Sequence, residues 1–258
     1  HSMKNIAFLI IFTTFLASSY SQKLIATINT TNEIEAYNFK YDSKTGAYIY
    51  NDYDTTAKKN LIITSKGNSV NRYSYSGVYN SLFDDDGNVY YFVYNLMTDT
   101  TYQYFVLKNG EEIGSYDYVG DAWEIKNGIL YYNAKLNGKS FLVSYDTKTG
   151  EMTFGKKYDD IFLVYYTQTY YEGEPAGFLG FTKDGRPFYM AVEGFEKFIV
   201  IGTEEQKHYA DIDPYQTKVD PNGEITYVAK SSGTLYMEKG NTFVVHGNKE
   251  YKSYDYVY

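Results

Sequence analysis

The stretch from Tyr75 to Gly114 reads YSGVYNSLFDDDGNVYYFVYNLMTDTTYQYFVLKNGEEIG, and it decides the fold. An aromatic alternating run follows an Asp-Gly pair, and a later run of the same kind ends at an Asn-Gly pair. These two pairs, placed between alternating runs, are the strongest short signals for β-hairpins, because glycine accepts a positive φ. The stretch therefore predicts a series of short antiparallel strands.

Two markers from this stretch recur along the chain. The turn glycine recurs at spacings of 41, 41, 57 and 38 residues, as Gly46, Gly87, Gly128, Gly185 and Gly223. A tyrosine usually followed by Asp and an aliphatic residue recurs at spacings of 41, 42, 51 and 45 residues, as Tyr75, Tyr116, Tyr158, Tyr209 and Tyr254. Two independent markers that recur at similar spacings indicate an internal repeat of about 41 residues.

A repeat of this length with four short strands is typical of a β-propeller blade. The sequence thus predicts an all-β fold, a five-bladed β-propeller of four-stranded antiparallel blades, running from about Asn32 to Tyr258. A β-solenoid repeats over far fewer residues, and a two-sheet sandwich has no such self-similarity. We expect one propeller domain over residues 22–258.

The motif SYDYV occurs at Ser115–Val119 and again at Ser253–Val257. The second copy has no turn glycine after it, so it begins a blade that it does not complete. The segment EIEAYNFKYDSKTG at residues 33–46 would supply the rest. We therefore expect the N- and C-terminal strands to pair, which closes the ring and removes an open sheet edge.

An aromatic residue, a polar glycine turn and a following Tyr-rich strand occur as FDDDGNVYYFVY at residues 83–94 and FTKDGRPFYMAV at residues 181–192. This pattern resembles the TolB-type β-propeller repeats of exported bacterial proteins. Asp precedes the glycine only at Gly87 and Gly185, and no copy has the fuller Ser-Pro-Asp-Gly form. The resemblance implies a fold and leaves the activity open.

The first residues predict export. His1 and Ser2 look like a vector-derived remnant before Met3, and Lys4 with the apolar run at residues 6–17 resembles a secretory signal peptide cleaved after Ser21. Twelve helical residues span about 18 Å, too short for a bilayer core of about 30 Å. We expect the mature protein to be periplasmic or at the cell surface, with no membrane insertion after cleavage.

The composition limits the classes of partner and chemistry. The chain has no Cys, so its stability must come from packing without disulfides, and it has 33 Tyr, which favour half-buried strand positions. A net charge of −8 argues against nucleic acid as a partner. His208 and His246 are the histidines of the mature chain. His208 lies three residues before Asp211 and five before Asp213, a spacing that could hold a metal, but no second histidine is near in sequence, so we interpret both as ordinary loop histidines. We predict no cofactor and no metal, and we interpret Asp84–Asp86 as turn residues whose carboxylates accept hydrogen bonds from the local backbone.

Acidic residues of the tyrosine marker form a first candidate site. If each begins the innermost strand of its blade, then Asp117, Asp159, Asp211 and Asp255 lie near one mouth of the channel. Such a ring of carboxylates could bind a cation or a basic partner. The alternative is that each accepts hydrogen bonds from the adjoining loop.

An insertion in the fourth repeat forms a second candidate site. The distance from Tyr158 to Gly185 is 27 residues, against 12 from Tyr116 to Gly128. The extra residues fall within FLVYYTQTYYEGEPAGFLGF at residues 162–181, which predicts an extended hairpin, and insertions in repeat proteins often map to the binding face. The residues predicted to bind a ligand or partner are Tyr165, Tyr166, Tyr170, Tyr171, Glu172 and Glu174.

Three functions remain open from the sequence. The first is a non-enzymatic exported propeller that binds another envelope protein as a scaffold subunit. The second is a carbohydrate-binding propeller with sugar pockets between blades. The third is a glycoside hydrolase in which Asp160, Glu172 and Glu174 supply the carboxylates.

Overall fold

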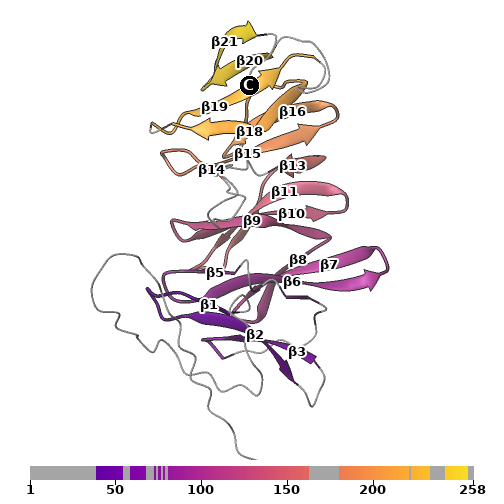
Figure 1. Ribbon diagram of the computed structural model, residues 1–258, viewed down its shortest axis with the longest axis vertical. Helices are drawn as coiled ribbons and strands as arrows, with labels where there is room; N and C mark the ends of the chain where they lie inside the picture. The colour runs from indigo at the N-terminus through magenta and orange to yellow at the C-terminus, as the bar shows by residue number, and fades with distance from the viewer. Residues whose placement is uncertain are drawn as a thin grey trace, which may run out of the picture. The chain divides into compact units, whose positions relative to one another are not determined.

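The computed structural model describes residues 39–54, 59–67, 73, 75–76, 78, 81–162, 180–220, 222–232 and 242–254. Within these ranges the chain is all-β, as expected, and forms strands β1 to β21 without an α-helix (Figure 1). No helix there has the length and apolar character needed to cross a membrane. The chain divides into two compact units, residues 1–100 with 105–114 and residues 101–104 with 115–258.

The strands form five antiparallel sheets, each built from strands that are consecutive in the chain (Figure 1). The first sheet has the order β1-β2-β3, with β1 at Phe39–Tyr41, β2 at Tyr48–Asp54 and β3 at Lys59–Thr64. The second has the order β4-β6-β7-β8, and β5 also pairs with β6. Its strands are β4 at Tyr75–Ser76, β5 at Leu82–Phe83, β6 at Val89–Thr98, β7 at Thr101–Lys108 and β8 at Glu111–Tyr116.

The other three sheets follow the same plan. The third is β9 (Tyr118–Lys126), β10 (Ile129–Leu136), β11 (Lys139–Asp146) and β12 (Met152–Phe154). In the fourth, β13 (Asp160–Phe162) and β14 (Gly180–Phe181) both pair with β15 (Pro187–Glu193), followed by β16 (Glu196–Ile201) and β17 (Glu204–Glu205). The fifth is β18 (Asp211–Val219), β19 (Ile225–Lys230), β20 (Thr242–His246) and β21 (Lys249–Tyr254).

The five marker glycines occupy the turns predicted for them. All five have φ in the left-handed region, between +71° and +84°. The turns connect β1 to β2, β5 to β6, β9 to β10, β14 to β15 and β18 to β19, so each sheet contains one marker glycine, as the repeat predicts.

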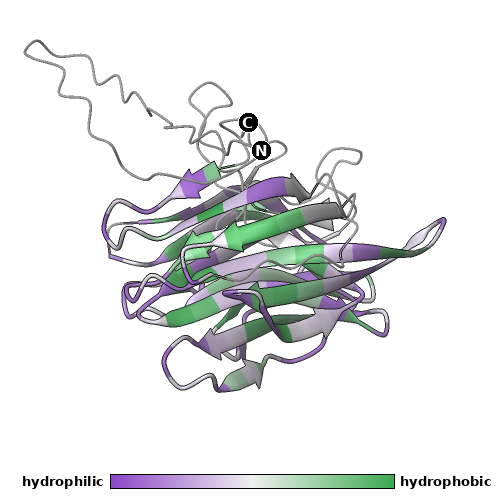
Figure 2. Ribbon diagram, turned by 90° about the horizontal axis from the view of Figure 1, so that it is seen from below, coloured by the Kyte–Doolittle hydropathy of each residue, from purple (hydrophilic) through white to green (hydrophobic). Residues whose placement is uncertain are grey.

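The fourth sheet is buried on both faces. Phe188 and Met190 of β15 pack in one apolar cluster with residues of the fifth sheet, and Tyr189 and Ala191 pack in another with Leu142 of the third sheet. Alternate residues of a strand point to opposite faces. The strand is therefore apolar from Pro187 to Val192, and hydrophilic residues concentrate in the turns (Figure 2).

The tyrosine marker has a packing role. Tyr116 ends β8, whereas Tyr158 and Tyr209 lie in the links that precede the fourth and fifth sheets, and all three are buried. The hydroxyl of Tyr158 donates to Glu205 over 2.9 Å, and that of Tyr209 donates to Glu250 over 3.1 Å. Tyr158 and Tyr209 therefore each connect the link before a sheet to the last strand of that sheet.

A lysine two residues before Tyr158 and before Tyr209 forms an ion pair with the same glutamate. Lys156 lies 2.6 Å from Glu205, and Lys207 lies 2.5 Å from Glu250. The hydrogen bond from each lysine lowers the pKa of its glutamate, and the tyrosine hydroxyl adds to the effect. The Lys-x-Tyr pattern is therefore a repeated structural device in the last two links.

Three of the turn glycines also lie close to the sheet before their own. A Cβ built on Gly87 would lie 3.3 Å from Thr45 of the first sheet, and one on Gly185 would lie 3.3 Å from Asn127 of the third. A Cβ on Gly223 would lie 2.9 Å from Cα of Lys183 in the fourth. Glycine at these positions therefore provides the close approach as well as the positive φ.

The first two residues of each SYDYV motif end the last strand of a sheet. Ser115 and Tyr116 end β8, and Ser253 and Tyr254 end β21, where they lie opposite Phe243 and Thr242. Residues 255–258 lie outside the described residues. Closure of a ring through them therefore stays a prediction.

Candidate functional site

The predicted insertion site falls on residues 163–179, which lie outside the described residues. This applies to every residue that was predicted to bind there, namely Tyr165, Tyr166, Tyr170, Tyr171, Glu172 and Glu174. The strands on either side are described: β13 pairs with Met190–Val192, and β14 pairs with Pro187–Phe188. The insertion therefore divides the first strand of the fourth sheet.

Two acidic residues of the predicted ring cap turns within their own sheets. Asp117 accepts a hydrogen bond from the backbone N–H of Asn137 over 2.6 Å, and Asp159 accepts one from that of Gly194 over 2.7 Å. Asp159 also pairs with Lys139 at 2.6 Å, and that hydrogen bond lowers its pKa below the ordinary range. Both carboxylates bond the hairpin turn that joins the second and third strands.

Asp211 is not structurally equivalent to those two. Its side chain is buried and lies 2.5 Å from Nζ of Lys197, and its Oδ1 accepts from the next backbone N–H. Asp160 has the same arrangement, since its Oδ1 accepts from Ser140 and from the next backbone N–H. Asp255 lies outside the described residues, and a ligand-binding role for the ring stays a prediction.

The other polar motifs have structural partners. His208 stacks on Phe198 with ring centroids 3.9 Å apart, and its Nδ1 lies 2.9 Å from Glu196. Asp84 accepts from the backbone N–H groups of Asp86 and Asn88, as a turn residue does.

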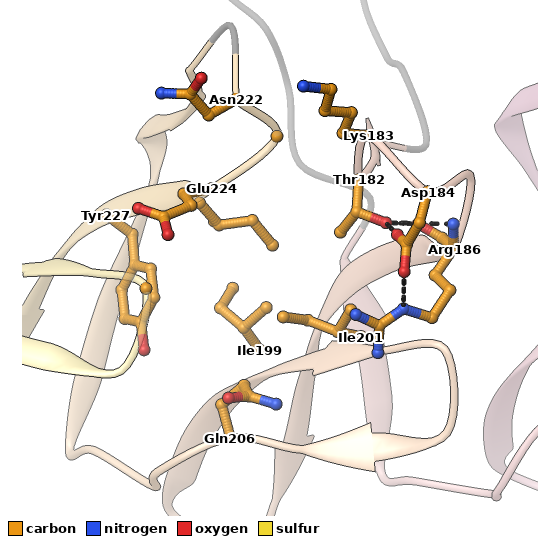
Figure 3. Close-up of a pocket in the computed structure, with 13 residues that line it drawn as sticks. Thr182, Lys183, Asp184, Arg186, Ile199, Ile201, Gln206, Asn222, Glu224 and Tyr227 are labelled. Carbon is orange, nitrogen blue, oxygen red and sulfur yellow. Dashed lines mark hydrogen bonds and ion pairs between the residues drawn. The ribbon is translucent and has the colours of Figure 1, made fainter.

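A pocket of about 420 Å³ lies between the first turns of the fourth and fifth sheets (Figure 3). Ile199 and Ile201 form its apolar floor, between Arg186 on one side and Tyr227 on the other. The Nε of Arg186 lies 2.8 Å from Asp184, which also accepts from the hydroxyl of Thr182. The Thr182 hydroxyl, with Arg186, lowers the pKa of Asp184. The charges of Arg186 and Asp184 neutralise each other, so this turn pocket is suited to binding by shape complementarity rather than to acid–base catalysis.

A second hollow of about 840 Å³ lies at the other end of the same strands. We call it the aromatic groove, because aromatic rings from both sheets line it. Phe195, in the β15–β16 turn, is 98 % exposed, and Tyr251 on β21 is 44 % exposed. Tyr209 and Phe243 are buried beneath, with ring centroids 5.5 Å apart. The remaining lining residues are Glu196, Lys207, His208, Ala210, Ser231 and Glu250.

A group of three polar residues was not recognised from the sequence. Asp220, Glu224 and His246 each place one potential metal-ligand atom within 4.8 Å of the others. The backbone N–H of Glu224 lowers the pKa of Asp220. His246 is 22 residues from Glu224, and only the pairing of β19 with β20 brings it close. The signal available in the sequence was the spacing of the two carboxylates around a turn glycine.

No family model and no curated protein matches the sequence. One similar solved structure is the β-propeller domain of the Trilobed protease from Pyrococcus furiosus, with 14 % identity and a TM-score of 0.35. That match covers 79 % of this chain and 66 % of the other. Another is a luciferin-regenerating enzyme, with 11 % identity, a TM-score of 0.33 and coverage of 83 % and 78 %. Similarity at this level transfers no activity.

Proposed function

We propose that the protein is an exported, non-enzymatic β-propeller of the TolB type that binds another protein as a scaffold subunit of a cell-envelope assembly. In this proposal the five sheets are the blades of one ring, and residues 255–258 pair with the first sheet to close it. The succession of five similar sheets supports the ring, because a blade needs neighbours to bury its two faces. The fourth sheet has such neighbours on both faces.

The observation that carries the binding proposal is the exposure of Phe195 at the edge of the aromatic groove. Phe195 is 98 % exposed and lines the same hollow as Tyr209, Phe243 and Tyr251. Aromatic residues at the centre of an interface contribute much of the binding energy when a partner buries them. An exposed Phe beside an aromatic hollow is therefore suited to insert into a partner.

The polar groups of the groove favour a protein over a sugar. Lys207 pairs with Glu250 at 2.5 Å, and Glu196 pairs with His208 at 2.9 Å. A sugar site needs polar side chains directed at the ligand hydroxyls, whereas these are bonded to each other. Phe195 itself offers only an apolar surface. Carbohydrate binding is therefore the second candidate, supported by the exposed ring of Tyr251.

The test begins with a photo-cross-linking amino acid at position 195 of the full chain, in its native envelope, to identify what contacts the groove. The affinity of the purified partner is then measured for Phe195→Ala and for the control Phe154→Ala. Phe154 is 58 % exposed, on β12 of the third sheet and away from the groove. We expect Phe195→Ala to weaken binding by about 30-fold, since a buried interface aromatic contributes about 2 kcal/mol.

The control should bind as the wild type does, and both variants should keep their melting temperature within about 2 °C. Equal affinities of the wild type and Phe195→Ala would contradict the proposal. A glycan array in which Tyr251→Ala, but not Phe195→Ala, loses a signal would favour carbohydrate binding instead.

A further inference from the structure

The fifth sheet holds a group of potential metal ligands that lies outside the aromatic groove. Asp220 follows β18, Glu224 precedes β19, and His246 is the last residue of β20. Their ligand atoms all lie within 4.8 Å of one another. We call these three residues the cation cluster.

The two carboxylates of the cluster are held by their turn. Oδ1 of Asp220 accepts from the backbone N–H groups of Asn222 at 2.7 Å and Glu224 at 3.0 Å. The backbone N–H of Gly223 also donates to the carbonyl of Asp220 over 2.9 Å. Both carboxylates therefore project from a backbone that is fixed before any ligand binds.

The imidazole of His246 is oriented from outside the cluster. Its Nδ1 lies 2.7 Å from the hydroxyl of Thr226, the residue directly opposite it on β19. Its Nε2 therefore faces the carboxylate of Glu224 at 2.8 Å. A metal-binding histidine typically has its second nitrogen engaged in this way, because the outer hydrogen bond fixes the ring and its tautomer.

His208 shows what an ordinary histidine–carboxylate pairing looks like in this protein. It also lies between two carboxylates, but Glu196 faces its Nδ1 at 2.9 Å and Glu205 faces its Nε2 at 3.7 Å. One ion cannot be bound through both ring nitrogens. In the cation cluster, by contrast, one nitrogen and two carboxylates converge on a single place.

We propose that Asp220, Glu224 and His246 bind a divalent transition-metal ion, with Zn²⁺ the best match. Bonds of about 2.0–2.1 Å place the ligand atoms of a tetrahedral zinc site about 3.3–3.4 Å apart, so side-chain movements of about 1 Å suffice here. The imidazole selects Zn²⁺, Ni²⁺ or Co²⁺ over Mg²⁺ and Ca²⁺, which prefer oxygen ligands alone. Glu224 also lines the turn pocket, so a fourth ligand has a route of entry.

The test is titration of the chelator-treated full-length protein with ZnCl₂, followed by calorimetry and by thermal melting. We expect one saturable site and a rise in melting temperature of about 5–10 °C at a free Zn²⁺ concentration of a hundred times Kd. MgCl₂ at the same concentration should produce neither effect.

Variants locate the site. His246→Gln and Asp220→Asn should each weaken Zn²⁺ binding at least 10-fold, and the matched control His208→Gln should leave it unchanged. Asparagine can still cap the turn, so Asp220→Asn decides the matter if His246→Gln fails to fold. The proposal is overturned if the wild type shows no saturable binding, if both cluster variants bind as the wild type does, or if His208→Gln removes the site. It does not depend on the proposed function.

Discussion

Replacing Gly223 by alanine tests whether the fourth and fifth sheets meet at their first turns. Gly223 has a φ of +84°, a conformation that costs a residue with a Cβ about 1–2 kcal/mol. The new Cβ would lie 2.9 Å from Cα of Lys183 and closer still to its backbone nitrogen, so the neighbouring turn must move. Overpacking of this kind adds about 1–3 kcal/mol, which brings the total to about 2–5 kcal/mol.

Gly138 provides the matched control. Its φ is +75°, and a Cβ there would have nothing within 4 Å. Gly138→Ala should therefore show only the conformational cost of about 1–2 kcal/mol. A change of 1 kcal/mol shifts the melting temperature of a domain of this size by about 2–4 °C. We expect a fall of about 2–8 °C for Gly138→Ala and about 4–20 °C for Gly223→Ala, measured by calorimetry.

The comparison isolates the contact between sheets, because both substitutions impose nearly the same backbone strain. If the two variants melt at the same temperature, the turn of Gly223 does not press on Lys183, and the stacking of these two sheets as described is wrong. If Gly138→Ala is the less stable of the two, the strain argument itself fails.

Two further predictions concern the link between sheets and the closure of the ring. The hydrogen bond from Lys207 holds the pKa of Glu250 below 4.5, so its stabilising contribution is present above about pH 4.5 and is lost as the pH falls through the lowered value. Melting temperatures of the wild type and Glu250→Gln should therefore differ at pH 6 and converge as the pH falls through that lowered pKa, and a difference that stays the same at every pH would contradict this. If residues 255–258 close the proposed ring, their deletion leaves β21 intact but should lower the melting temperature by several degrees, whereas an unchanged melting curve would exclude closure through them.

The sequence was sufficient for the strands and turns because their signals are local. Asp-Gly, Asn-Gly and alternating aromatic residues act over a few positions, and the five marker glycines accordingly occur in the turns with positive φ. The spacing of the tyrosine marker also identified it as part of the repeat. Only the structure shows its role, in which the ring of Tyr158 or Tyr209 is buried and its hydroxyl donates a hydrogen bond to a glutamate of the sheet that follows.

The acidic marker shows where spacing alone fails. Asp159 comes one residue after its marker tyrosine, and Asp211 comes two residues after its own. A shift of one residue changes the direction of a side chain along an extended chain. Asp159 therefore caps a turn at the surface, whereas Asp211 is buried against Lys197. Residues that look equivalent in the repeat occupy two structural positions.

The packing of the sheets restricts where binding residues can be placed. A strand such as β15 contacts neighbouring sheets with both faces, so a polar or oversized residue at its centre would disturb one of two cores. Side chains at strand ends and in turns are free of this restriction. Phe195 lies in a turn, and the cation cluster lies at a turn and a strand end. The insertion at residues 163–179 lies between β13 and β14, and both of these strands pair with β15. New binding residues can therefore be added at these positions without disturbing the repeat.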